Sequence, residues 1–247
     1  PGSANIWFTV FGGHLYNDDG SPDLANAKNL DALNWLKALM DAQGGYAKVK
    51  SFKDTMDVFG DGNQYVKDQV GVQTWAQWYP NVLAGTASKV SLEAIPIKDL
   101  TGKNVAMAEC TAFAIPKAAK NPSAACAWAI TVTSTHAWLA AGQARAQTVE
   151  KNKSIATGLM TGSPVADQAI RDKYVAKTDN ADFAQVIDTY YSVLADNRPW
   201  GSSPVAQQAT QELTNAVTVA MTGEKSTQQA RADAQAAAQR AWDQVKK

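Results

Sequence analysis

The clearest hydrophobic pattern along the chain is helical. In "SPDLANAKNLDALNWLKALMDAQGG", leucines and a methionine repeat at spacings of three and four, which predicts an amphipathic helix capped by Asp23 or Ser21 and ended by Gly44 and Gly45. A second helical piece is predicted near residues 53–61. Further on, an apolar stripe predicts a long helix in the C-terminal part of the chain. Its members are Val205, Ala209, Leu213, Val217 and Met221.

Capping residues predict the starts of four helices and the ends of two. Asparagine and serine accept hydrogen bonds from the free N–H groups of a first turn, proline fits the first helical position, and glycine favours a helix end. The predicted boundaries are Asn121 with Pro122, then Ser134 or Thr135 with a stop at Gly142, then Ser203 with Pro204 and a stop at Gly223, and finally the capping-box pair Ser226 and Gln229.

Three short segments between these helices are predicted to be strands. They are "VGVQTW", "VSLEAIPI" and "MAECTAFAI". The second alternates in the manner of a half-buried strand, and the third is apolar on both faces, as a central strand of a covered sheet is. Strands that alternate with helices predict the α/β class, here with an additional helical layer at the C-terminus.

Composition narrows the range of functions. The 247 residues are 45% hydrophobic and 19% charged, so a sizeable core can form. Lys plus Arg and Asp plus Glu number 23 each, which leaves no basic surface typical of nucleic-acid binding. No apolar run is long enough to span a bilayer. Nucleic acid is therefore not expected as a partner.

Candidate catalytic and metal-binding groups are few. The chain has two cysteines and two histidines, which lie in unrelated stretches, so neither a zinc site nor a Cys-His nucleophile is predicted. "DVFGDG" resembles a calcium loop but lacks the required ligands, and we expect no metal and no cofactor. Cys110 and Cys126 are expected to be close in space, because a strand and the helix that follows it pack face to face. Whether they are bonded stays open.

Eight tryptophans are the most informative excess. Trp35, Trp128, Trp138 and Trp242 fall inside predicted helices, where core or half-exposed packing explains them. Trp7, Trp75, Trp78 and Trp200 fall in or beside predicted loops and strand ends. A flat indole stacks on the C–H face of a sugar while nearby polar groups bind its hydroxyls. The alternative is that these rings only plug loops against the core.

Several segments, taken in order, resemble the extracellular solute-binding proteins of sugar ABC importers of the maltose and multiple-sugar type. The aromatic pair of "WFTVFGG" leads into "HLYNDDG" and a helix, and "FGDGNQYVKDQVGVQTWAQW" resembles the family's segment with a binding-site tryptophan. "TAFAIPKAAKNP" and the closing helices around "GEKS" also match. This chain departs from the family's pattern at Val72, where methionine is usual, and at "AECT", where two glycines are usual.

The resemblance implies a type II periplasmic-binding-protein-like fold with two lobes and a hinge. It assigns 1–95 to the first part of the second, C-terminal lobe, 96–138 to a segment of the first, N-terminal lobe, and 139–247 to the closing helices of the second lobe. Because the family's proteins are longer at the front, the chain is expected to be a fragment that lacks the front of the first lobe.

The same resemblance implies a binding function in which no covalent bond is made or broken. A mono- or oligosaccharide would bind in an interlobe cleft, and closure about the hinge would present the loaded protein to the permease subunits of an ABC transporter. The expected location is extracytoplasmic, with membrane association only through an N-terminal lipid anchor that is absent from this sequence. The ligand-binding residues expected from this reading are Trp78, Trp7, Trp75, Tyr79, Glu109, Thr111, Arg145 and Trp200.

Two other function classes use the same aromatic residues. A glycoside hydrolase would combine them with a pair of carboxylates, whose separation a sequence cannot give. An aromatic-rich interaction domain would bind a protein instead of a small ligand. Turnover of a sugar would indicate the first class, and the lack of any saccharide-induced stabilisation would indicate the second.

Overall fold

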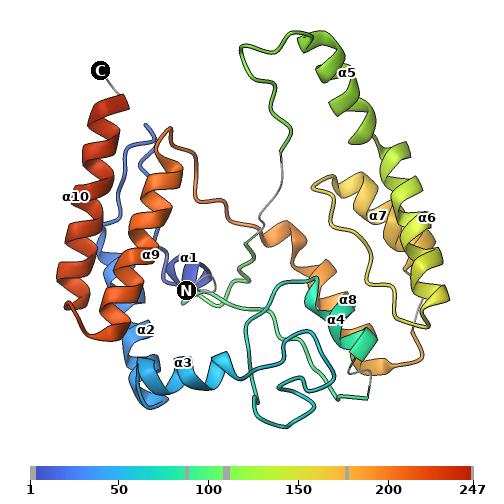
Figure 1. The fold of residues 1–247 in the computed structure, drawn as a ribbon, viewed down its shortest axis with the longest axis horizontal. Helices are drawn as coiled ribbons and strands as arrows, with labels where there is room; N and C mark the ends of the chain where they lie inside the picture. The colour runs from blue at the N-terminus through green and yellow to red at the C-terminus, as the bar shows by residue number, and fades with distance from the viewer. Residues whose placement is uncertain (1–3, 87–88, 108–111, 176–177, 246–247) are drawn as a thin grey trace. The chain divides into compact units, whose positions relative to one another are not determined.

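The computed structural model describes residues 4–86, 89–107, 112–175 and 178–245, and helices dominate them (Figure 1). The helices are α1 (Asn5–Val10), α2 (Ala27–Ala42), α3 (Tyr46–Asp54), α4 (Tyr79–Thr86), α5 (Pro122–Val132), α6 (Thr135–Lys151), α7 (Pro164–Tyr174), α8 (Ala181–Ser192), the 3-10 turn η2 (Leu194–Asp196), α9 (Ala206–Thr222) and α10 (Thr227–Val245).

The chain divides into two compact units by its internal packing. Unit 1 comprises Pro1–Met56, Ile95–Ala108 and Ser192–Lys247, and unit 2 comprises Asp57–Ala94 and Glu109–Tyr191. One unit boundary, between Ala94 and Ile95, lies next to the lobe boundary expected near residue 95, whereas no unit boundary lies near residue 138. The units describe packing within this chain, so the assignment of its segments to lobes stays a prediction.

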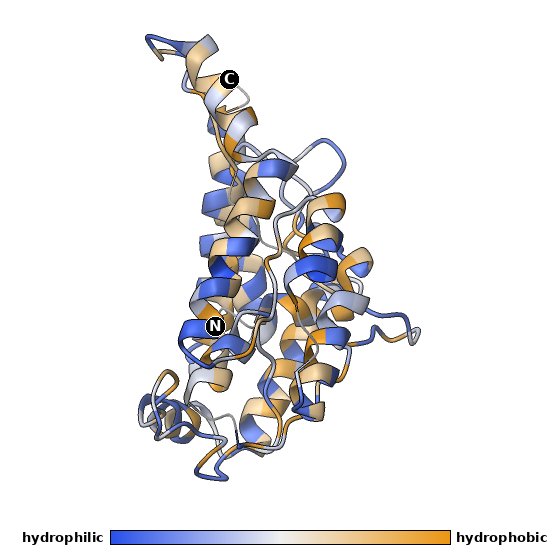
Figure 2. Ribbon diagram, turned by 90° about the vertical axis from the view of Figure 1, so that its right-hand side faces the viewer, coloured by the Kyte–Doolittle hydropathy of each residue, from blue (hydrophilic) through white to orange (hydrophobic). Residues whose placement is uncertain are grey.

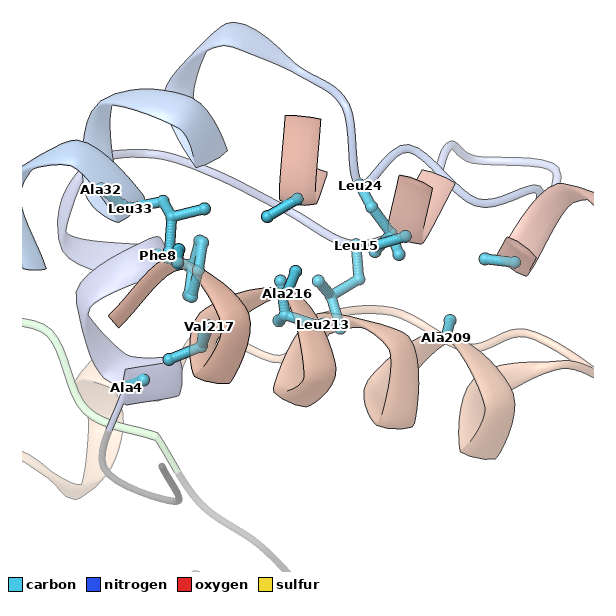
Figure 3. Close-up of a cluster of buried hydrophobic side chains, with 14 of the residues drawn as sticks. Ala4, Phe8, Leu15, Leu24, Ala32, Leu33, Ala209, Leu213, Ala216 and Val217 are labelled. Atoms are coloured by element: carbon cyan, nitrogen blue, oxygen red, sulfur yellow. The ribbon is translucent and has the colours of Figure 1, made fainter. Parts of the chain in front are cut away.

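Unit 1 is built around α2, α9 and α10, with α1 packed against the same core (Figures 1 and 3). Phe8 of α1, Leu33 of α2 and Leu213 of α9 are each at most 4% exposed. All five residues of the stripe predicted for the C-terminal helix are buried, which confirms it. On α10, Ala230, Ala234 and Ala238 are buried at intervals of four, and their small side chains let α9 approach closely.

Hydrophobic and hydrophilic residues are interspersed along the helices in Figure 2, as expected where one face is buried. In α2 the buried face includes Leu33, whereas Leu39, which belongs to the predicted stripe, is 40% exposed. The second predicted helix was misplaced: α3 ends at Asp54, and residues 57–64 form turns.

The helix caps differ from the prediction in three places. Asn121 precedes α5 as predicted, but its side chain makes no capping hydrogen bond. Asn26, and not Asp23 or Ser21, caps α2 by accepting a hydrogen bond from the Asn29 N–H at 2.9 Å. Asp23 is occupied elsewhere, because its carboxylate contacts the His14 ring at 2.8 Å. Helix α9 begins at Ala206, after the predicted Ser203 and Pro204.

Other predicted boundaries are confirmed. Ser134 caps α6 through the Ala137 N–H, and Ser226 accepts from the Gln229 N–H. Pro122 occupies the first turn of α5, and Gly223 ends α9 in the left-handed conformation, with a φ of 79°.

Gly142 does not end its helix, contrary to the prediction. Helix α6 continues through it to Lys151, and Gly142 is buried. A Cβ atom at this position would lie 3.0 Å from the Tyr174 ring and 3.2 Å from the Ile170 side chain. The glycine therefore serves the close contact between α6 and α7 in unit 2 and does not serve as a stop signal.

The predicted strands do not form β-ladders in the residues that the structure describes. Only isolated bridges occur there, between Tyr16 and Pro22, Lys98 and Asn104, and Ala106 and Asn197. "VGVQTW" is irregular, with Val72 93% exposed, and "MAECTAFAI" lies partly outside the described residues. A ladder needs a second backbone beside each segment.

In "VSLEAIPI" the backbone bonds to side chains of α8 instead. The Leu92 N–H donates to the Asp182 carboxylate at 3.2 Å. Gln185 accepts from the Ala94 N–H at 2.9 Å and donates to the Ala94 carbonyl at 2.8 Å. One glutamine side chain thus satisfies both backbone groups of Ala94, as a neighbouring strand would have done.

Candidate functional site: an aromatic cluster in unit 2

Phe59, Trp75, Trp78 and Tyr79 come together in unit 2, and we refer to these four residues as the aromatic cluster. Trp78 immediately precedes α4, and Tyr79 is its first residue. Trp75 lies in the irregular segment before them, and Phe59 lies in the turns that follow α3. Three of the four were predicted site residues. Phe59 was not predicted.

Tyr79 anchors the aromatic cluster. It is 2% exposed, and its hydroxyl accepts hydrogen bonds from the side-chain amides of Asn63 at 2.6 Å and Gln64 at 2.9 Å. The hydroxyl also donates to the Val58 carbonyl at 3.1 Å. Both amide residues are fully buried, so they hold the phenol in one position by bonds that water does not compete for.

Trp78 is fixed against this anchor while much of it stays exposed. Its ring meets Tyr79 at 87° and Trp75 at 71°, with centroids 5.7 and 6.0 Å apart. Phe59 lies nearly parallel to Trp78, at 13° and 6.0 Å. Trp78 is 42% exposed and Phe59 66% exposed. Edge-to-face contacts therefore orient the indole, while parts of the Trp78 and Phe59 side chains remain open to water.

Trp75 is held through its backbone. Its carbonyl accepts a hydrogen bond from the Tyr190 hydroxyl at 3.1 Å, and its ring lies 4.3 Å from that of Tyr79. The indole N–H is buried and has no hydrogen-bond partner among the described residues. A buried donor in this state costs folding free energy.

Polar groups border the aromatic cluster on the α4 side. Asn81 donates to the Trp78 carbonyl at 3.2 Å and accepts from the Thr157 hydroxyl at 2.7 Å. A shallow pocket begins at the residues that flank Trp78 and Tyr79. It is lined by Gln77, Pro80, Thr157, Met160, Ile187 and Tyr190.

Tyr65 packs at the back of the aromatic cluster, with its ring 6.3 Å from that of Tyr79. Burial, as the largest cause, and the charges that Tyr79 and Tyr190 acquire on ionisation together raise its pKa from 10.0 to about 12. The folded state therefore favours the protonated phenol.

This pKa predicts an alkaline loss of stability. The contribution of Tyr65 is fully present below about pH 10, the unfolded value, and is lost as the pH rises toward about 12. We expect Tyr65→Phe to reduce the fall in melting temperature over this range, measured by circular dichroism. An unchanged fall would show that Tyr65 ionisation does not contribute.

The predicted site residues Trp7 and Trp200 lie in unit 1. Trp7 is in α1, whereas it was predicted to lie in or beside a loop or strand end, and its ring lies 4.5 Å from that of Trp35. The Trp200 indole N–H donates to the Thr9 hydroxyl at 2.7 Å, and Trp200 packs against the unit 1 core. Trp35 itself is 36% exposed, so unit 1 has an aromatic surface of its own.

Of the remaining predicted site residues, one does not belong to the aromatic cluster and two are not described by the structure. Arg145 is exposed on α6 and borders another shallow pocket, between α6, α7 and the segment around Gly158. Glu109 and Thr111 lie outside the described residues, as does Cys110, so its proximity to the exposed Cys126 stays a prediction.

Across residues 4–86, 89–107, 112–175 and 178–245, no three His, Cys, Asp or Glu side chains are grouped to hold a metal ion. Within the same ranges, no helix combines the length and apolar character needed to cross a bilayer.

Comparison with known proteins identifies the fold. No family model and no curated protein sequence matches the chain. Among solved structures, it is similar to CpMnBP1 with mannotriose bound, with a TM-score of 0.68 and 19% identity over 95% of this chain and 56% of that chain. CpMnBP1 with mannobiose bound gives a TM-score of 0.63 at 19% identity, over 95% and 55% of the two chains.

A third similar structure is an ABC transporter solute-binding protein from Thermotoga lettingae TMO, bound with alpha-D-tagatose. Its TM-score is 0.59 at 16% identity, over 96% of this chain and 55% of that chain. The resemblance predicted from the sequence is therefore confirmed at the level of fold. The chain spans little more than half the length of these solute-binding proteins.

Proposed function

We propose that a protein containing this chain binds a carbohydrate at the aromatic cluster and delivers it unchanged to an ABC transporter permease outside the cytoplasm. The observation that carries the proposal is the Trp78 ring, which is 42% exposed and yet oriented by two edge-to-face contacts. A binding surface fixed before the ligand arrives loses little entropy on binding.

The chemistry of the surroundings fits a sugar. The exposed faces of Trp78 and Phe59 are suited to the C–H face of a pyranose ring. The side chains of Gln77 and Thr157, which line the neighbouring pocket, supply donors and acceptors for hydroxyl groups.

The similar solved structures support the same ligand class, since their bound molecules are mannotriose, mannobiose and tagatose. They are binding proteins, which favours binding without turnover. The interlobe cleft, the lobe assignment of 1–95, 96–138 and 139–247, and delivery to permease subunits are parts of the proposal that concern the complete protein.

A thermal-shift screen of the complete protein against mannobiose, mannotriose, tagatose and other mono- and oligosaccharides tests the proposal. A ligand at a hundred times its dissociation constant should stabilise the protein by about 2.7 kcal/mol. Chromatography of the sugar after incubation should show no product. Absence of a shift with every saccharide would contradict sugar binding, and product formation would indicate a hydrolase.

We further expect the 247-residue chain alone to bind the same sugar far more weakly than the complete protein. A ligand that contacts only the part present here keeps some polar groups unpaired. Titration calorimetry on both proteins measures the difference. Equal affinities would show that the aromatic cluster and its surroundings form the whole site.

A further inference from the structure

Helix α5 differs from the other long helices because it is apolar and exposed. Eight of its 11 residues are Ala, Cys, Trp, Ile or Val, and it has no charged residue. None of its residues is buried, whereas α9 buries six. Trp128 is 58% exposed and Ile130 65% exposed, although packing was expected for Trp128. Figure 1 shows α5 extending from the start of α6, away from α7.

The extended residues before α5 enlarge this surface. The Phe113 ring lies 5.2 Å from that of Trp128, at 89°, which is a specific edge-to-face contact. Phe113 is 54% exposed and Ile115 40% exposed. We call Phe113, Ile115, Trp128 and Ile130 the α5 surface. Trp128 and Ile130 are two residues apart and therefore lie on different sides of α5. A helix that is apolar on all sides is ordinarily buried, so its exposure here marks it as an element that contacts something else.

A membrane is a poor occupant for the α5 surface. With 11 residues the helix is too short to span a bilayer. A helix that lies in the bilayer interface carries a charged face opposite its apolar one, and α5 has no charged residue.

The fold comparison indicates a different occupant. About 95% of this chain matches CpMnBP1, but the match covers 56% of that protein, so a large part of the shared fold has no counterpart here. We infer that the α5 surface, namely Phe113, Ile115, Trp128 and Ile130, is an intramolecular interface for polypeptide of the remaining part of the fold. The inference depends on α5 and the fold comparison, and not on sugar binding.

A charge introduced at Trp128 tests the inference. In the complete protein we expect Trp128→Arg to lower the melting temperature strongly or to prevent folding, because it would place an arginine in an apolar interface. In the 247-residue chain the same change should leave the melting temperature nearly unchanged and lower the binding of an apolar fluorescent dye. Val165→Arg, on α7, is the matched control, since Val165 is 69% exposed and lies outside the α5 surface.

Hydrogen exchange on the unmodified proteins gives a second readout that does not depend on any variant folding. The α5 amides should exchange about a hundredfold more slowly in the complete protein than in the 247-residue chain. Equal exchange rates, or equal tolerance of Trp128→Arg and Val165→Arg in the complete protein, would overturn the inference. A concentration-dependent dimer that Trp128→Arg dissociates, with the complete protein unaffected, would instead assign the surface to a second copy.

Discussion

Trp78→Ala is expected to weaken saccharide binding about tenfold to a hundredfold in the complete protein, with little loss of folding stability. Removing a large aromatic contact from a ligand costs about 1–3 kcal/mol, and each 1.4 kcal/mol is about a factor of ten in affinity. Stability should change little because the ring is already 42% exposed. Titration calorimetry and urea unfolding on the same variant measure both quantities.

Trp128→Ala controls for the loss of a tryptophan outside the aromatic cluster. Trp128 pairs with Phe113 and not with the aromatic cluster, so its removal should leave the affinity for sugar unchanged wherever the variant folds. If Trp78→Ala keeps native affinity but loses about 3–5 kcal/mol of folding free energy, then Trp78 is a packing residue. Trp75 or Trp7 would then be the candidate for stacking on the ligand.

Phe183→Ala is expected to lower the free energy of unfolding by about 3–5 kcal/mol. Phe183 is completely buried on α8, where it packs with Tyr79 and Leu83. Its truncation would leave a cavity directly beneath the residue that anchors the aromatic cluster. Urea unfolding followed by circular dichroism measures the loss.

Phe59→Ala is the matched control for that variant. Phe59 belongs to the same unit but is 66% exposed, so its truncation should change stability by no more than about 0.5 kcal/mol. Its effect should instead fall on ligand affinity, because it lies parallel to Trp78. A small loss for Phe183→Ala would mean that unit 2 can close around the missing ring.

Helices whose buried stripe is long could be predicted from the sequence. The α9 stripe from Val205 to Met221 and the stop at Gly223 are confirmed, because both depend on local spacing and backbone preference. The stop predicted at Gly142 was wrong for a tertiary reason. Nothing near it in the sequence reveals that Ile170 and Tyr174 approach the same position from another helix.

Three strands were predicted that form no ladder in the described residues, because a strand needs a partner that its own sequence does not reveal. Val70 and Val72 belong to a strand-like pattern, yet a lone segment has no ladder to join, and Val72 is almost completely exposed. The helix that contains Trp7 was not predicted, because its six residues are too few to show a periodic pattern.

The aromatic cluster was partly predictable. Trp75, Trp78 and Tyr79 are neighbours in the sequence, so their proximity follows from the chain itself. Phe59 and the amides of Asn63 and Gln64 come from 15 or more residues upstream of Tyr79. In the sequence these three residues stand in the turn-rich string "FGDGNQ", which was the one signal available. Polar residues in such a string are ordinarily solvated, whereas Asn63 and Gln64 are buried.

The bonds between Gln185 and Ala94 bear on association as well as on folding. The segment around Leu92 is rich in residues that favour strands, and an extended backbone with free N–H and C=O groups is a template on which other chains can pair. Gln185 occupies both groups of Ala94, and Asp182 occupies the N–H of Leu92. Two polar side chains of one helix thereby occupy backbone groups through which this segment could pair with a strand of another chain.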